Sequence, residues 1–404
     1  MTEKTNIPQG YKNSPLGIIP KEWEVKRVCD FGKVVTGSTP PTNDVDNYGS
    51  AYMFVGPVDI TESKYIKSTE KYLSEKGFSI SRNMPKGSVL FTCIGSTIGK
   101  CAIADENLTS NQQINAVICN SNHNEEFLYY ELTNRSNKIR LIAGEQAVPI
   151  INKSTFENIR ILCPPLIEQE RIVSVLGLWD TAIEKQSELI EKLKLRKRAL
   201  MQQLLTGKKR LPGFSGEWKE VKLGDVFDER NETNRDDLPL LSITGDKGVI
   251  YQSDSDKRDI SNDDKSKYKR ICPNDIGYNT MRMWQGRSAL SELEGIVSPA
   301  YTIVTPRESI NVKFMSMLIQ QPRVVYDFWT HSQGLVSDTL NCKYPDFCQV
   351  KVRIPTKQEQ TAIASVLVKA DKEIELAKDK LASLQSQKRG LMQQLLTGKK
   401  RINS

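Results

Sequence analysis

The sequence predicts an α+β protein in which two sheet-dominated domains of mixed α/β structure are separated by two long antiparallel helices that form a coiled coil. The first observation behind this prediction is a pseudo-twofold internal repeat. Residues 164–210 and 355–401 align at a constant offset of 191 and are identical at 24 of 47 positions. The second is a heptad pattern of apolar residues in both copies. The third is a set of short apolar runs, typical of strands, in the unlike segments before each copy.

Composition limits the number of domains, the class of protein and the kind of partner. The chain has 404 residues, of which 38% are hydrophobic and 26% charged, so it can bury the cores of about two or three domains. No apolar run approaches the roughly 20 residues that a membrane span needs, and we expect a cytoplasmic protein. The net charge of +8 is compatible with a polyanionic partner but does not require one.

The eight cysteines indicate neither a metal site nor a disulfide framework. None of them forms a C-x-x-C pair, and only His123 and His331 could add imidazole ligands. We expect reduced and largely buried thiols, because free cysteine behaves as a small hydrophobic residue.

The first domain is predicted over residues 1–163. Apolar runs at 51–60, 87–95 and 114–120 are punctuated by Gly, Pro and Asn and predict strands, whereas residues 127–134 predict a helix. A long spacer helix is then predicted within 164–211. Its apolar residues recur in alternating steps of four and three, and Gly207 stands where a left-handed C-cap belongs.

The second domain is predicted over residues 212–354, with strands at 238–244 and 295–306 and a helix at 311–320. The second spacer helix falls within 355–404. Thr356 and Glu359 have capping-box spacing at its start, and Gly398 is the matching C-cap.

The repeat also predicts the relative direction of the two helices. The second domain follows the end of the first helix, so by equivalence the first domain should lie beside the end of the second helix. The first domain is also joined covalently to the start of the first helix. The end of one helix and the start of the other should therefore meet at each domain, which requires antiparallel helices.

The sequence argues against self-contained catalysis. Residues 95–100 resemble a phosphate-binding loop, but the loop is one residue short and Cys101 follows where a magnesium-binding Ser or Thr is needed. There is no G-x-G-x-x-G dinucleotide motif, and two histidines leave little material for a catalytic triad. We therefore expect a chain that is not an enzyme and binds no cofactor or metal.

Two variable domains on a rigid spacer suit a long ligand with two separated features, and double-stranded DNA is the natural candidate. Amide, hydroxyl and guanidinium groups recognise base edges, and Lys and Arg hold phosphates. The candidate DNA-binding residues are Ser38, Thr39, Ser96, Thr97, Lys100, Asn111 and Gln112 in the first domain and Arg282, Trp284, Gln285 and Arg287 in the second.

The whole chain resembles the specificity subunit of type I DNA restriction–modification systems. The resemblance rests on Glu-Gln-x-x-Ile near the start of each long helix and Leu-Leu-Thr-Gly at its end. IIPKEW and VVTGSTPPTND resemble the entry to that family's first target-recognition domain, and YNTMRMWQGRSAL with GIVSPAYTIV resembles a common second one.

The resemblance implies a non-catalytic subunit that recognises a bipartite DNA target with one domain per half-site. It implies two methyltransferase subunits that modify adenine and two motor-endonuclease subunits as partners, with S-adenosylmethionine, ATP and Mg bound by those partners. The helices would set the spacer and dock the methyltransferases. The residues implied in these roles are Glu168, Gln169, Ile172, Leu176, Ile183, Leu193, Leu200, Leu204, Glu359, Gln360, Ile363, Leu367, Ile374, Leu384, Leu391 and Leu395.

The residues alone leave three other interpretations open. One is a free-standing bivalent DNA-binding regulator, and another is a nuclease or methyltransferase in a single chain, which the missing motifs disfavour. The third is a coiled-coil scaffold that does not bind DNA. Such a scaffold would need neither variable domains nor basic helix ends.

Overall fold

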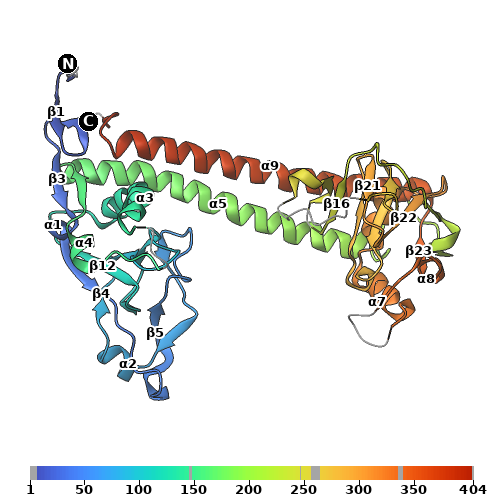
Figure 1. The fold of residues 1–404 in the computed structure, drawn as a ribbon, viewed down its shortest axis with the longest axis horizontal. Coiled ribbons are helices and arrows are strands. Elements are labelled where there is room, and N and C mark those ends of the chain that lie inside the picture. Colours follow the sequence, from blue (N-terminus) through green and yellow to red (C-terminus); the bar gives the residue numbers. More distant parts are fainter. Residues whose placement is uncertain (1–6, 145–147, 246, 256–263, 335–339, 403–404) are drawn as a thin grey trace. The chain divides into compact units, whose positions relative to one another are not determined.

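A computed structural model describes residues 7–144, 148–245, 247–255, 264–334 and 340–402. These residues pack as two compact units (Figure 1). Unit 1 comprises Met1–Gln186 and Lys380–Ser404, and unit 2 comprises Ser187–Asp379. Each unit therefore holds one sheet-rich domain together with half of each long helix.

The first domain, in unit 1, is built on two main sheets with strand orders β4-β12-β9-β10-β6 and β7-β5-β11-β8. Helix α3 packs on β9 and β10. Strands lie in each of the three runs predicted from the sequence, and α3 contains the predicted helix. The strands are β1 (Tyr11–Ser14), β2 (Gly17–Pro20), β3 (Glu24–Arg27), β4 (Gly32–Thr36), β5 (Tyr48–Val55), β6 (Tyr65–Ile66), β7 (Lys71–Leu73), β8 (Asn83–Met84), β9 (Val89–Thr92), β10 (Cys101–Ala104), β11 (Leu108–Ser110), β12 (Ile114–Cys119) and β13 (Arg160–Cys163); the helices are α1 (Val28–Phe31), α2 (Glu75–Ser79), α3 (Glu125–Ile142) and α4 (Lys153–Glu157).

Helix α3 begins where its sequence supplies a cap. The side chain of Asn124 accepts a hydrogen bond of 3.0 Å from the backbone N–H of Phe127, and two glutamates occupy the first turn beside the positive end of the helix dipole. Phe127 and Tyr130 are fully buried on the face of α3 that joins the main core of the unit.

The second domain, in unit 2, has a four-stranded sheet in the order β15-β22-β19-β20. The predicted strand at 295–306 is two strands, because the chain turns at Pro299 and Ala300, where the Tyr301 N–H donates to the Ser298 carbonyl. The elements are β14 (Lys219–Lys222), β15 (Phe227–Glu229), β16 (Leu241–Thr244), β17 (Gly248–Tyr251), β18 (Lys269–Ile271), β19 (Ile276–Asn279), β20 (Ser288–Leu290), β21 (Gly295–Val297), β22 (Tyr301–Pro306), β23 (Lys351–Ile354), α6 (Val312–Leu318), α7 (Pro322–His331) and α8 (Tyr344–Gln349).

Both domains lead into their long helix in the same way. In unit 1, β3 pairs antiparallel with β13, which runs directly into α5 (Leu166–Leu204). In unit 2, β14 pairs antiparallel with β23, which runs directly into α9 (Lys357–Leu395). A two-stranded ribbon therefore connects the first and last segments of each domain to the start of its helix.

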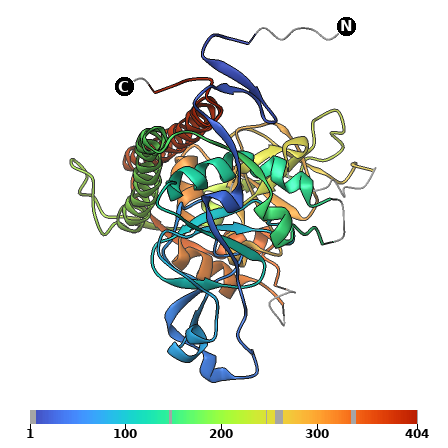
Figure 2. The ribbon, with the colours of Figure 1, turned by 90° about the vertical axis from the view of Figure 1, so that its left-hand side faces the viewer.

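The helices are antiparallel within each unit, as predicted. In unit 1, Glu168 pairs with Arg401 and Asp180 with Lys388, so position numbers rise along one helix as they fall along the other. Figures 1 and 2 show the start of α5 beside the end of α9 in this unit. In unit 2 the same order appears between the end of α5 and the start of α9. The pairs there are Arg196 with Glu373, Lys197 with Asp371 and Arg210 with Glu359.

The predicted heptad positions form the seam of the helices, and every one of them is buried or half-buried. The helix ends also follow the prediction. Gly207 and Gly398 both have φ +69°, the left-handed conformation that glycine adopts without steric cost. None of the described helices combines the length and apolar character needed to cross a membrane.

The capping box predicted for α9 forms only in part. The Glu359 backbone N–H donates to Thr356 Oγ1 at 3.4 Å. The Glu359 carboxylate does not bond back to the cap, because it accepts both hydrogen bonds from Arg210 instead. Tertiary pairing with an arginine has replaced the local bond.

Candidate nucleic-acid interface

Four of the candidate residues in the first domain meet where two loops approach each other. Thr39 Oγ1 donates to Gln112 Oε1 at 2.7 Å, which joins the loop after β4 to the loop between β11 and β12. In the same loops, Ser38 donates its backbone N–H to the carbonyl of Ser110, the residue before Asn111. The side chains of Thr39 and Gln112 are exposed, so their remaining hydrogen-bonding groups are accessible to solvent.

A glycine permits this approach. The backbone of Gly37 is so close to the second loop that a Cβ there would lie 2.1 Å from the carbonyl oxygen of Asn111. Any other residue would push the two loops apart. The position of Gly37 in the T-G-S-T segment therefore has a packing reason.

The other three candidates of the first domain lie within Ser96 to Lys100, the turn between β9 and β10 beside these two loops. Cys93 donates its backbone N–H to the Gln113 carbonyl at 2.8 Å, and Lys100 Nζ donates to the Pro57 carbonyl at 3.2 Å. Gly95 and Gly99 have φ +87° and +101°, so both glycines serve a tight turn. The seven candidate residues of the first domain thus occupy adjoining loops.

Arg82 is a further member of this cluster that sequence reasoning missed. Its backbone N–H donates to Ser38 Oγ at 3.0 Å, and its Nη1 donates to the Thr36 carbonyl at 3.1 Å. The side chain is exposed and keeps its remaining guanidinium donors. No local signal marks Arg82, because it reaches the cluster across 44 residues of chain.

The four candidates of the second domain lie on one short loop. The loop spans residues 280–287 and contains a single turn of 3₁₀ helix, Met283–Gln285, which ends at Gly286 with φ +71°. Met283 is fully buried and anchors the loop, and Trp284 Nε1 donates to the Met281 carbonyl at 3.0 Å. The side chains of Arg282, Gln285 and Arg287 are exposed, and among the described residues the Arg282 guanidinium has no hydrogen-bond or ion-pair partner.

Two exposed aromatic residues flank this loop. Helix α7 packs against the 3₁₀ turn, and its Tyr326 and Trp329 are 60% and 46% exposed, with ring centroids 5.5 Å apart. Neither was singled out from the sequence. Exposed aromatic rings beside free cations are suited to contacts with nucleic acid.

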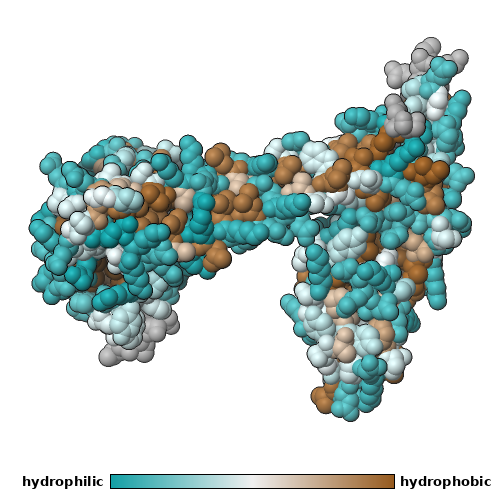
Figure 3. All heavy atoms as spheres, turned by 180° about the vertical axis from the view of Figure 1, so that it is seen from behind, coloured by the Kyte–Doolittle hydropathy of each residue, from teal (hydrophilic) through white to brown (hydrophobic). Residues whose placement is uncertain are grey.

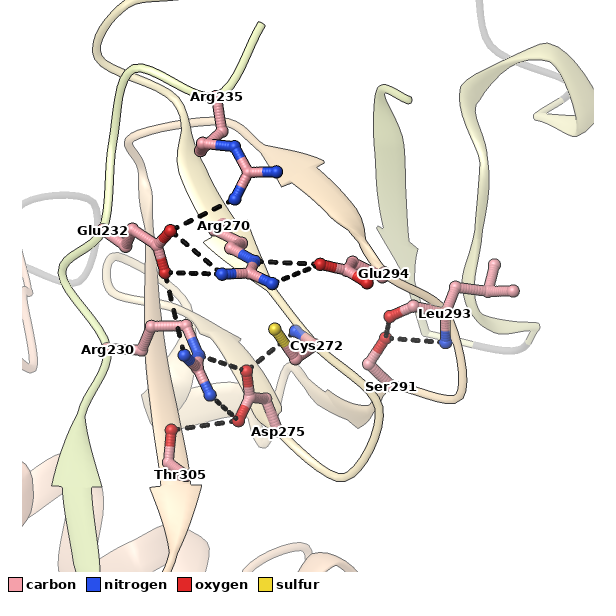
Figure 4. Close-up of polar contacts among 10 residues, drawn as sticks. All are labelled: Arg230, Glu232, Arg235, Arg270, Cys272, Asp275, Ser291, Leu293, Glu294 and Thr305. Carbon is pink, nitrogen blue, oxygen red and sulfur yellow. Dashed lines mark hydrogen bonds and ion pairs between the residues drawn. The ribbon is translucent and has the colours of Figure 1, made fainter. Parts of the chain in front are cut away.

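Arg230 and Arg270 of the second domain are instead paired with carboxylates (Figure 4). Arg230 Nε lies 2.7 Å from Asp275, and Arg270 pairs with both Glu232 and Glu294. The carboxylate hydrogen bonds raise the pKa of both guanidinium groups. This network crosslinks strands, and it separates structural arginines from Arg282 and Arg287, which have no such partner among the described residues.

Thiols and acidic groups are among the side chains of the described residues that could form a reactive or metal-binding arrangement. All eight cysteines are free, and burial raises the pKa of Cys93 and Cys342 to about 12, so both stay protonated near neutral pH. Among the described residues, no group of His, Cys, Asp or Glu could hold a metal ion.

The side chains implied in partner docking are partly used inside the chain. Glu168 and Glu359 are buried in arginine pairs. Gln169 and Gln360 are buried and accept the backbone N–H of Asn124 and Asn311, both at N-caps, at 2.9 and 2.8 Å. Any partner contact of these segments would therefore fall to exposed positions of the same helices.

Residues 20–195 match the family described as the type I restriction modification DNA specificity domain. The type I restriction enzyme MjaIX specificity subunit of Methanocaldococcus jannaschii is 34% identical over 46% of this chain and 45% of its own length. The MjaVIII specificity subunit of the same organism is 23% identical over 96% of this chain and 95% of its own length. The chain thus spans less than half of the first relative and nearly all of the second.

Two solved structures share the fold. One is described as "Structural basis underlying complex assembly and conformational transition of the type I R-M system". It has a TM-score of 0.60 at 17% sequence identity, and the match covers 94% of this chain and 99% of that chain. The other is a type I restriction–modification S subunit from M. genitalium, with a TM-score of 0.55, 15% identity, and 98% and 99% coverage. With the repeated helices and the paired domains, these matches make the chain similar to type I restriction–modification specificity subunits: residues 20–195 match their DNA specificity domain, and the whole chain shares the fold of the solved structures.

Proposed function

We propose that this chain recognises a bipartite double-stranded DNA target, with the first domain contacting one half-site and the second domain the other. It would act as the non-catalytic part of a cytoplasmic complex. The methyltransferase subunits of that complex modify adenine, and its motor-endonuclease subunits cleave unmodified DNA. The stoichiometry proposed is two of each around one specificity subunit.

One observation carries the proposal. Two domains with unlike exposed loops lie at helix ends that are joined by the same glutamate–arginine pair, Glu168 with Arg401 in unit 1 and Glu359 with Arg210 in unit 2. Like helix ends combined with unlike loops are what a bipartite target requires, because each half-site has its own bases. The loops expose the polar groups that contact bases and phosphates.

The helices also offer a surface for protein partners. Leu178, Leu195 and Leu376 are exposed although they lie on helices, and Figure 3 shows apolar side chains along the helical part of the surface. Exposed apolar residues on a helix suit contact with another helix. We place the methyltransferase subunits there. S-adenosylmethionine, ATP and Mg would be bound by the partner subunits, as the resemblance to type I systems implies.

The proposal is tested by sequencing methylated DNA with and without this gene in the host, and after replacing residues 20–160 by the first domain of another family member. The wild-type chain should direct adenine methylation to a two-part motif, and the replacement should change one part only. Methylation that changes in both parts would refute one domain per half-site. A chain that binds its site tightly but purifies without partner subunits would instead be a free-standing regulator.

A further inference from the structure

A cluster of charged side chains joins the first domain to both long helices inside unit 1. Asp180 of α5 pairs with Lys388 of α9 and accepts a hydrogen bond from the hydroxyl of Tyr130. Lys64, which precedes β6, lies with its Nζ 3.3 Å from Asp180 and 2.7 Å from Glu126 of α3. These five residues are called the latch below.

The latch is balanced in charge and shielded from water. Two lysines face two carboxylates, and both ammonium groups also lie over the ring of Tyr130, at 5.4 Å for Lys64 and 5.3 Å for Lys388. The side chains of Lys64, Lys388 and Asp180 are only 13%, 16% and 22% exposed. Removing one member leaves a poorly solvated charge without its partner, so the cluster resists partial opening.

The latch is a second attachment of the first domain to the helices. The first attachment is the main core of the unit, which contains Leu176 of α5 and Leu395 of α9. Asp180 lies one turn beyond Leu176, and an ion pair of 3.1 Å between Lys67 and Glu184 lies a further turn along. A domain held at one place on a helix can pivot there, whereas one held at successive turns cannot.

The internal repeat supplies a comparison within the same chain. Asp371 and Lys197 are the repeat equivalents of Asp180 and Lys388, and they form the same ion pair in unit 2. Their side chains are 48% and 24% exposed. Within the described part of unit 2, no side chain of the second domain bonds to this pair. Among the described residues, the second domain makes no ion pair with the helices at the corresponding level.

We infer that the latch fixes the angle of the first domain on the helix pair and thereby makes the subunit selective for one spacer length between the half-sites. Its members are positioning residues, because they act on the direction in which the recognition loops point. This inference rests on the proposed bipartite recognition. A freely pivoting domain would still recognise its bases but would accept half-sites displaced along the DNA.

The test uses the full chain in its complex with the methyltransferase subunits. The variants are Asp180→Asn and Lys64→Met, with Asp371→Asn as the matched control and Asp180→Glu as the conservative substitution. The readout is the ratio of the methylation rate at the native spacer to the rate at spacers one base pair longer or shorter. We expect this ratio to fall roughly five- to tenfold in the two latch variants, the scale of ordinary coupling between sites, and to stay unchanged in the other two. A general loss of stability would lower both rates together and leave the ratio alone.

A second measurement needs neither DNA nor partners. Spin labels are placed at Ile80 of the first domain and Leu178 of α5, which are 57% and 71% exposed. Noncanonical amino acids carry the labels, because the chain has eight cysteines. The distance distribution should broaden in Lys64→Met and Asp180→Asn but not in Asp371→Asn.

An unchanged ratio together with an unchanged distribution in folded Lys64→Met protein would overturn the inference. So would an equal fall of the ratio in Asp371→Asn, which would trace the effect to helix pairing. If wild-type complex methylates no bipartite site, the proposed function fails, and the label distances still decide whether the latch holds the domain. If Asp180→Asn does not fold, Lys64→Met carries the same two measurements.

Discussion

Arg401, just beyond the end of α9, grips Glu168 in the first turn of α5 with two hydrogen bonds of 2.6 and 2.9 Å. Arg210, just beyond the end of α5, grips Glu359 in the first turn of α9 with two of 2.6 Å. The same bidentate pair therefore closes both units, and it connects the end of one helix to the beginning of the other. Bidentate pairing adds geometric specificity as well as energy, so each pair sets the register of the helices locally.

The two pairs differ in whether the glutamate keeps another hydrogen-bond donor when the arginine is removed. Trp23 Nε1 also donates to Glu168 at 2.9 Å, whereas Trp218 Nε1 is buried with no partner among the described residues. We expect Arg210→Ala to loosen the start of α9 more than Arg401→Ala loosens the start of α5. Hydrogen exchange at the two helix starts measures this directly, because one melting temperature is not well defined for a two-domain chain. Arg210→Lys should fall between wild type and Arg210→Ala. Equal protection in both alanine variants would contradict the role given to Trp23.

The glycines that end the helices make a second prediction. Gly398→Ala should destabilise by more than the roughly 1–2 kcal/mol of a left-handed alanine, because its Cβ would lie 2.5 Å from Pro20 Cδ. Gly207→Ala should cost less, since its Cβ would lie 3.3 Å from Trp218 Cε2. Gly390, inside α9 with open space around it, is the control, and Gly390→Ala should stabilise by about 0.5–1 kcal/mol. Chemical denaturation ranks the three, and a destabilising Gly390→Ala would refute the reasoning.

The exposed arginine and amide of the second domain should carry half-site discrimination. Arg282→Ala or Gln285→Ala should weaken discrimination against altered bases in the second half-site by roughly 1–3 kcal/mol, provided that either side chain makes a bidentate base contact. The first half-site should be unaffected. Arg235→Ala is the matched control, because Arg235 is engaged by Asp237 at 2.7 Å and by Glu232. Competition binding with single-base variants of each half-site provides the measurement. If Arg235→Ala also lost discrimination, the argument that only arginines without a carboxylate partner contact the bases would be wrong.

His123 predicts a pH effect on stability. Burial lowers its pKa, and Lys26 Nζ, 3.4 Å from Nε2, lowers it further. The unfolded chain therefore takes up the proton first, so this contribution to stability is complete above about pH 6.5 and is lost as the pH falls below that value. We expect the free energy of local unfolding around His123, measured by hydrogen exchange in the first domain, to fall more in wild type than in His123→Gln between pH 7.5 and 5.5. Parallel pH profiles would show that His123 is not responsible.

Features that follow from local rules were predictable from the sequence. The repeat and the seam residues predicted an antiparallel pair, and Gly207 and Gly398 have the left-handed conformation expected of a C-cap. The comparisons agree with the resemblance found in the sequence, because residues 20–195 match the type I restriction modification DNA specificity domain and the chain shares the fold of a solved type I S subunit. The seam and the C-caps were predictable because periodicity and capping depend on neighbouring residues, and the antiparallel direction followed from the internal repeat.

Features that depend on distant pairing were not predictable. Arg401 and Glu168 are 233 positions apart, so neither residue's neighbours indicate the pair. Glu359 was assigned to a capping box by its spacing, but an arginine from the other helix end took its carboxylate. Arg82 and the latch were missed for the same reason, since each is assembled from segments that only the tertiary fold brings together.

The central claim is that the length of the long helices sets the spacer between the two half-sites, and lengthening both helices tests it most directly. Four residues are inserted after Glu188 in α5 and, at the equivalent position, after Asp379 in α9, where both side chains are exposed. Each insertion adds roughly 6 Å of rise at about 1.5 Å per residue and turns the helix by about 40° beyond a full turn. One base pair turns DNA by about 34–36°, at 10–10.5 base pairs per turn, and advances it by roughly 3.4 Å. Sequencing of methylated sites should therefore show unchanged half-sites with a spacer one to two base pairs longer. An unchanged spacer in an active, folded complex would contradict the account.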